Sequence, residues 1–153
     1  MPYGPILAAE NTPATREAEK LYVPSASDIA PGGYFHVVMT FSPYYASGEQ
    51  AGDHDLLFFD AMNRLYVRAA DNAIVLQVEG TDLLETPALT WTRDRELTVE
   101  VESTEAGGPN LRVAGADEGE VVDNDPAAVP FPVTGPIYII GGVTGAQESA
   151  DLR

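Results

Sequence analysis

Carboxylates are the most abundant side chains in this sequence that could do chemistry. The chain of 153 residues has 24 Asp and Glu residues against 8 Lys and Arg residues. Two acidic segments could bind a metal ion. The first contains Asp53, Asp55 and Asp60, and the second contains Asp117, Asp123 and Asp125. Calcium binds several carboxylate and carbonyl oxygens held in loops, and neither segment follows the EF-hand pattern. The sequence predicts no required cofactor; calcium is a candidate ligand, and the alternative is an acidic loop in an acidic protein.

Glu100 and Glu102 are the best candidates for a catalytic carboxylate pair. A pair of this kind is what glycoside hydrolysis uses, and the two residues share one face of a predicted strand. They have no aromatic neighbours along that strand, so a solvated face is the favoured interpretation. A Ser/His/Asp triad needs a histidine base, and the sequence has only His36 in a predicted strand and His54 between two aspartates. Without a Gly-x-Ser-x-Gly turn either, we predict no catalytic residue and no enzyme.

Three aromatic residues could stack on sugar rings, namely Tyr44, Tyr45 and Trp91. Tyrosine and tryptophan rings offer an apolar face with a polar handle, which suits carbohydrate ligands. Tyr44 and Tyr45 follow Pro43 in a long polar loop, where binding residues often lie. The competing interpretation places Trp91 in the core and uses the tyrosine pair to plug one end of the fold.

Alternation of apolar and polar residues identifies the elements that must position these side chains. In residues 96–102, Leu97, Val99 and Val101 point one way and the glutamates point the other way, which is typical of a half-buried β-strand. Similar short segments occupy residues 34–41, 56–59, 65–68, 74–78, 83–89, 111–114 and 137–140. Turn residues separate them about every ten residues, and no long helical pattern intervenes. We therefore predict an all-β protein with two antiparallel sheets packed as a sandwich.

Composition excludes several classes of function. The net charge of −16 repels nucleic-acid backbones and anionic membrane surfaces. The absence of cysteine excludes disulfides and Cys-ligated metal sites. Residues 1–10 show neither a basic region nor a long apolar run, so no secretory signal is seen, and no apolar segment is long enough for membrane insertion. The acidity itself indicates high solubility, adaptation to salt, cation binding, or docking onto a basic partner.

The chain divides into an N-terminal arm or linker, residues 1–17, and a β-sandwich domain, residues 18–153. The arm contains Pro2, Pro5 and Pro13. Residues 14–20 could form a short helix, or an irregular approach to an edge strand at residues 21–23. Residues 117–130 are expected to form an extended acidic loop, with an edge strand near Val129, Phe131 and Val133. The sequence ends where a closing strand would be expected to continue.

The order of these strands resembles the laminin-G-like, concanavalin A-like jelly-roll superfamily. The resemblance covers residues 20–153 and is carried by Trp91 before a strand, the Leu-x-Val-x-Val strand at 97–101, the small-residue strand at 111–115, and Ile137-Tyr138-Ile139-Ile140-Gly141-Gly142. It implies a jelly-roll sandwich and the roles of lectins, adhesion domains, glycosidase accessory domains and parts of surface assemblies. The metal motif of legume-type lectins cannot be aligned here, and the Glu-x-Asp-x-x-Glu motif of related glycosidases is absent.

These observations favour a non-enzymatic structural or interaction module. We expect a subunit or decoration of an extracellular or virion surface assembly, with other protein subunits as partners and a homo-oligomer or larger assembly as the working form. The proline-bearing arm and the end of the sequence motivate this prediction, because an unpaired edge invites a neighbouring chain. The alternative is a carbohydrate-binding, lectin-like module, with calcium as a possible aid.

Overall fold

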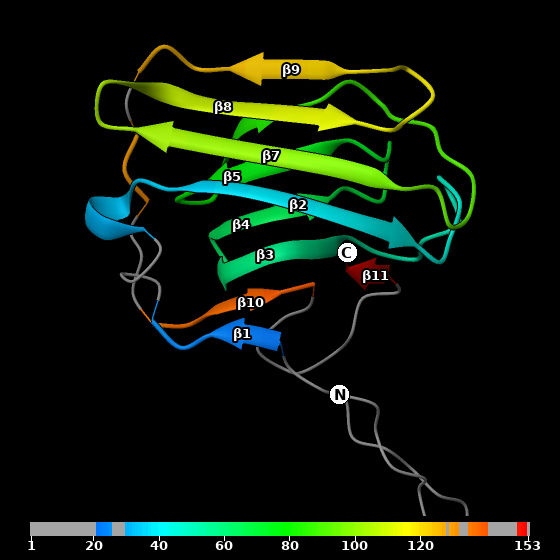
Figure 1. Ribbon diagram of the computed structural model, residues 1–153, viewed down its shortest axis with the longest axis horizontal. Helices are drawn as coiled ribbons and strands as arrows, with labels where there is room; N and C mark the ends of the chain where they lie inside the picture. Colours follow the sequence, from blue (N-terminus) through cyan, green and yellow to red (C-terminus); the bar gives the residue numbers. More distant parts are fainter. Residues whose placement is uncertain (1–20, 26–29, 128, 132–134, 141–149, 153) are drawn as a thin grey trace, which may run out of the picture.

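The computed structural model describes residues 21–25, 30–127, 129–131, 135–140 and 150–152. These residues form two antiparallel sheets, and no α-helix occurs among them. Sheet A has the order β1-β10-β3-β4-β5-β6 and sheet B has the order β11-β2-β7-β8-β9 (Figure 1). The prediction of an all-β, two-sheet antiparallel sandwich is thus confirmed. No helix within these ranges has the length and apolarity needed to cross a membrane.

Sheet A consists of six strands. Their bounds are β1 (Leu21–Val23), β3 (His54–Asp60), β4 (Asn63–Val67), β5 (Ile74–Val78), β6 (Thr81–Glu85) and β10 (Ile137–Ile139). Strands β3 to β6 form a meander, in which each strand pairs with the next one along the chain. The β5–β6 turn uses Glu79 and Gly80, both with positive φ (51° and 78°), as a two-residue hairpin turn compatible with strand twist requires.

Sheet B consists of five strands. Their bounds are β2 (His36–Pro43), β7 (Leu97–Thr104), β8 (Gly107–Ala114), β9 (Val121–Asn124) and β11 (Ala150–Leu152). Strands β7 to β9 form a second meander, and β2 adds to it through six residue pairs with β7. A one-turn 3₁₀ helix, η2 (Pro31–Gly33), precedes β2. At one side of the sandwich the amide of Glu85 in β6 donates to Asp123 of β9 at 2.9 Å, which links the two sheets.

The core lies between the sheets and receives every second residue of the strands. Leu97, Val99 and Val101 are at most 1% exposed, while Glu100 and Glu102 lie on the opposite face, as the alternation predicts. The largest fully buried side chains come from both sheets and the loops between them; they include Trp91, Phe41, Leu56, Leu65, Ile74, Leu76 and Leu111. Burial of this apolar surface is the main force that holds the two sheets together.

Two local predictions were wrong, and two segments with turn-forming or strand-breaking residues lie within strands. Gly107, Gly108 and Pro109 belong to β8, because the two-residue turn before it is Glu105–Ala106. Strand β2 continues to Pro43, where it pairs with β11. The expected acidic loop of residues 117–130 contains β9.

The second wrong prediction concerns Val129 and Phe131, which lie outside any strand. Phe131 is instead a buried anchor: its amide donates to the carbonyl of Gly33, and its ring packs edge-on against Phe35 with centroids 5.0 Å apart. The edge strand predicted at residues 21–23 is confirmed as β1. The predicted arm, the helix at residues 14–20 and Val133 lie outside the described residues.

Candidate functional site

The outer face of sheet B presents side chains in straight rows across the strands. The strand registers place Val38, Glu100, Arg112 and Val122 opposite one another on β2, β7, β8 and β9. We call these four residues the central row. A second row contains His36, Glu102, Asn110 and Asn124, and a third contains Thr40, Thr98 and Ala114. Because the rows follow from backbone pairing, their spacing is fixed by the sheet itself.

The middle of this face is a compact set of ionisable groups. Glu100 Oε1 lies 2.8 Å from His36 Nε2, and Glu100 Oε2 lies 3.6 Å from a guanidinium nitrogen of Arg112. A carboxylate can only accept, so Nε2 of His36 carries the hydrogen in this contact. Glu102 has no hydrogen bond to a described side chain and remains exposed to solvent. The two glutamates of the candidate catalytic pair therefore differ, because Glu100 is held by two partners and Glu102 is open to a ligand.

A shallow pocket of about 180 Å³ opens beside these groups. It is lined by Glu100, Glu102, Asn110, Arg112 and Val122. The lining supplies hydrogen-bond acceptors, donors and one apolar contact, but it contains no serine, cysteine or lysine nucleophile. The pocket can therefore bind a small polar group.

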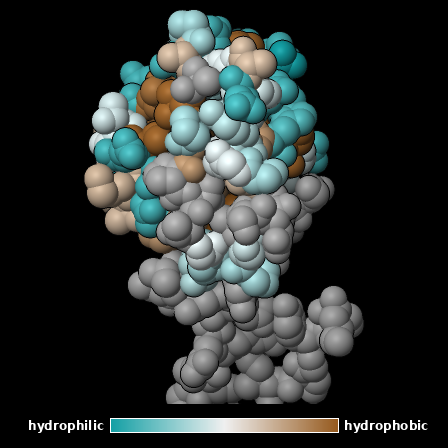
Figure 2. All heavy atoms as spheres, turned by 90° about the vertical axis from the view of Figure 1, so that its left-hand side faces the viewer, coloured by the Kyte–Doolittle hydropathy of each residue, from teal (hydrophilic) through white to brown (hydrophobic). Residues whose placement is uncertain are grey.

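The two valines at the ends of the central row are unusually accessible for apolar residues. Val38 is 59% exposed and Val122 is 52% exposed, and only Tyr44 and Met62 are comparable among the large apolar side chains of the described residues. Figure 2 views the end of the sandwich that lies on the left in Figure 1, where hydrophilic residues are mixed with small groups of apolar ones. On the outer face of sheet B, Glu100 and Arg112 lie between Val38 and Val122 in the central row, so the two valines do not form one apolar patch.

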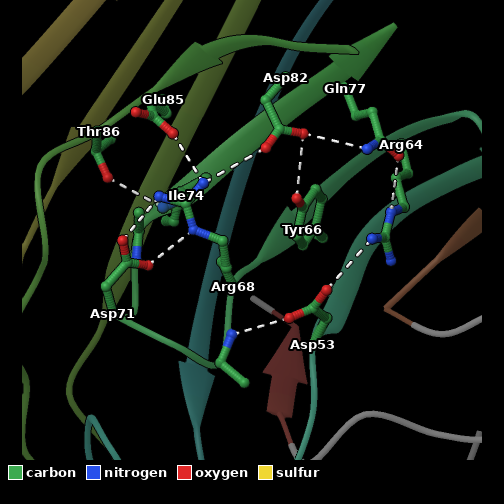
Figure 3. A network of polar contacts seen from close by, with 12 residues as sticks. Asp53, Arg64, Tyr66, Arg68, Asp71, Ile74, Gln77, Asp82, Glu85 and Thr86 are labelled. Carbon is green, nitrogen blue, oxygen red and sulfur yellow. Dashed lines mark hydrogen bonds and ion pairs between the residues drawn. The ribbon is translucent and has the colours of Figure 1, made fainter. Parts of the chain in front are cut away.

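The outer face of sheet A carries a denser polar network (Figure 3). Arg68 binds both carboxylate oxygens of Asp71, at 3.0 and 2.7 Å, and Glu85 at 2.8 Å. Hydrogen bonds from the Arg68 guanidinium hold the pKa of Asp71 below its usual range. The Asp71 and Glu85 carboxylates in turn raise the pKa of Arg68. These contacts tie the loop after β4 to the end of β6.

Arg64 forms the second half of this network. Its guanidinium lies 3.8 Å from the centre of the Tyr66 ring, and it contacts Asp55 at 3.2 Å and Asp53 at 3.3 Å. The Tyr66 hydroxyl donates to Asp82 at 3.3 Å, and burial raises the pKa of this hydroxyl. Tyr66 is only 3% exposed although it points away from the main core. The charges on this face are thus engaged with one another, which suits a structural role.

The structure does not bring the six candidate metal-binding aspartates together. Asp53 and Asp55 contact Arg64, whereas Asp60 accepts hydrogen bonds from the backbone amide of Met62 and the side-chain amide of Asn63 at the β3–β4 turn. In the second segment, each aspartate has its own partner: Asp117 contacts Arg95, Asp123 accepts from the amide of Glu85, and Asp125 accepts from the amide of Ala127. Within the part of the chain that is described, no group of three or more His, Cys, Asp or Glu side chains could hold a metal ion.

The three candidate ligand-binding aromatics have different environments. Trp91 is 2% exposed, and its indole N–H donates to the carbonyl of Tyr45 at 3.0 Å. The Tyr45 ring packs edge-on against Trp91 and against His54, at centroid distances of 6.1 and 4.7 Å. Tyr44 points outward and is 55% exposed. Of the three, only Tyr44 can offer its ring to a ligand from solvent.

His54 beside this aromatic group gives a testable dependence of stability on pH. Burial lowers the pKa of His54, and the charges of Asp53 and Asp55 only partly oppose this effect. The unfolded chain therefore binds the proton more tightly than the folded one. Folding stability should fall as pH decreases from about 6.5, the ordinary histidine value, through the lowered folded-state pKa.

We expect His54→Gln to flatten this dependence, although losing the contact with Tyr45 lowers stability at every pH. Urea midpoints measured from about pH 7.5 to about pH 5.5 would show the effect. A wild-type urea midpoint that stays constant or increases as the pH is lowered would contradict the prediction. So would a variant that keeps the wild-type slope.

Sequence reasoning missed several residues of the sheet B face, above all Val38, Asn110, Arg112 and Val122. The alternation shows that each points outward, but only the pairing of strands far apart in the sequence places them in rows. It also missed the Arg64–Tyr66 contact, for which the spacing of two residues on one strand face was an available signal. Comparison of the chain with protein-family models, with curated proteins and with solved structures found no match.

Proposed function

We propose that this chain is a non-enzymatic structural or interaction module. It serves as a subunit or decoration of an extracellular or virion surface assembly, and it binds other protein subunits through the outer face of sheet B. The same proposal includes a jelly-roll topology of the laminin G-like or concanavalin A-like kind, which a two-sheet antiparallel sandwich supports at a coarse level.

One observation carries the proposal: the outer face of sheet B is nearly neutral in its three rows, although the protein is strongly acidic. Its three rows contain two carboxylates, one guanidinium and one imidazole, whereas the whole chain has a net charge of −16. On the outer face of sheet A, the network around Arg64 and Arg68 contains five carboxylates, a surplus of three negative charges. An acidic protein partner therefore meets less repulsion at the three rows of sheet B than at the network on sheet A, and there it can also cover Val38 and Val122.

The proposal predicts assembly in solution. We expect the sedimentation coefficient of the purified full chain to increase as its concentration rises through the micromolar range. Val122→Glu should weaken this association, because it buries a charge in place of an apolar contact. Met62→Glu is the matched control, since Met62 is 54% exposed on the β3–β4 turn of the other sheet and receives the same new charge. A wild-type chain that stays monomeric at every concentration would remove the proposal.

A carbohydrate-binding, lectin-like module is the second candidate function. The pocket beside Glu102 and Arg112 favours it, because its mixture of donors, acceptors and an apolar side chain matches the hydroxyl groups and apolar faces of a sugar. A glycan array probed with and without calcium tests this candidate. Binding that is lost in Arg112→Ala but kept in Arg93→Ala would support it, and a negative array in both conditions would dismiss it.

A further inference from the structure

We propose that the outer face of sheet B binds a second copy of this chain about a two-fold axis parallel to the strands, which runs between β7 and β8. This inference rests on the proposed function and specifies its partner and geometry. Most homo-oligomers are symmetric, and in a two-fold interface each residue meets its counterpart from both sides. The arrangement of the central row makes this orientation specific.

Rotation about such an axis reverses the order of the strands in the facing copy. Strand β2 then faces β9 of the second copy, and β7 faces β8. Within the central row, Val38 meets Val122 and Glu100 meets Arg112, each contact occurring twice. The two glutamates and two arginines form a group of alternating charge between two apolar contacts. Packed sheets lie about 10 Å apart, with their strands within about 30° of parallel. The residues of the two copies therefore face each other most closely at the centre of the face.

The second row supports the same orientation. His36 comes to face Asn124, and Glu102 comes to face Asn110, whose amide can donate to the open carboxylate. No pair of like charges is opposed in either row. Glu102, which has no hydrogen bond to a described side chain, thereby gains a donor.

The other two-fold orientation, with the axis across the strands, opposes each strand to its own copy. Glu100 would then meet Glu100, and Arg112 would meet Arg112. Like charges opposed in an interface are strongly unfavourable. The charge pattern therefore selects one of the two symmetric arrangements.

The expected dimer is weak. The three rows supply fewer residues than the roughly 20–30 a side found in stable interfaces, and each chain carries a net charge of −16. Dimerisation should be measured at about 0.15 M salt. The Debye length of about 8 Å then reduces long-range repulsion between the chains but preserves the interactions of neighbouring charges.

Charge reversal tests the proposed pairing. Arg112→Glu and Glu100→Arg, each alone, would place like charges in both central contacts. We expect each variant to dimerise with a dissociation constant at least about tenfold higher than that of the wild type. In an equimolar mixture, one chain presents two carboxylates and the other presents two guanidiniums, so both contacts again join opposite charges. We expect the mixture to form a one-to-one heterodimer, which native mass spectrometry can count directly.

Arg93→Glu is the control, because Arg93 is exposed outside the three rows and undergoes the same change of charge. It should dimerise like the wild type. Recovery of dimers on mixing also shows that the two variants fold. The proposed pairing is overturned if the single variants dimerise like the wild type, or if mixing them does not restore dimers. The proposed function still stands in that case, provided that the wild type assembles. A wild type that remains monomeric overturns both.

Discussion

Gly108→Ala is expected to destabilise the protein by about 2–4 kcal/mol, which is large for the addition of one methyl group. Gly108 lies in β8, where the chain of Asp125 to Ala127 passes close to the strand. A Cβ atom at Gly108 would overlap the carbonyl oxygen of Asp125 and come within 2.8 Å of the carbonyl oxygen of Ala127. Backbone atoms cannot rotate away as a side chain would, so the segment must move and weaken the hydrogen bond from the Asp125 amide to Pro109.

The neighbouring glycine provides the matched control. A Cβ atom at Gly107 would lie 3.6 Å from the Thr104 hydroxyl, an ordinary contact, and Gly107 has no positive φ. Gly107→Ala should leave stability unchanged or raise it by about 0.4–1 kcal/mol through the unfolded state. Urea unfolding followed by circular dichroism compares the two variants. Equal stabilities would show that the close approach of residues 125–127 to β8 is not present in solution.

The fold class was predictable because period-two alternation is a local property of the sequence. The strand at 97–104 shows this best, since three apolar residues and the intervening polar ones decide its two faces without reference to the rest of the chain. The β7–β8 turn was not predictable from turn residues. Gly107, Gly108 and Pro109 look like a turn, yet Gly108 is required by a backbone segment that lies 17 residues away in the sequence. Close packing between distant segments has no local signal.

The candidate site was likewise predictable only where its features depend on local sequence. The sequence correctly identified the outward face that carries Glu100 and Glu102, but it could not show that His36 and Arg112 contact Glu100 from the two neighbouring strands. Acidic loops predicted possible cation ligands from composition alone. In the structure, nearby arginines and backbone amides occupy these carboxylates, and such partners depend on strand register and turn geometry rather than on acidity.

Trp91→Ala should cost about 3–5 kcal/mol, the largest loss we expect from a single truncation. Trp91 is 2% exposed at the end of the core, and its ring lies beside that of Tyr45. Trp91→Phe should cost less, about 1–3 kcal/mol, because it keeps an aromatic ring but leaves the carbonyl of Tyr45 without its indole donor. Tyr44→Ala is the aromatic control; since Tyr44 is 55% exposed, we expect a change within about 0.5 kcal/mol.

Trp91 is the only tryptophan, so its fluorescence separates a structural role from a role in ligand binding. A buried indole should emit at short wavelength in the folded protein and shift to longer wavelength on urea unfolding. Because the Trp91 ring is covered by the core, we expect a bound glycan to leave this emission unchanged. A glycan that binds at the loop containing Tyr44 should instead bind more weakly to Tyr44→Ala. Quenching of Trp91 by a sugar, together with small losses of stability in both Trp91 variants, would show that the indole is accessible. That result would place the residue in a ligand site and remove it from the core that joins the two sheets.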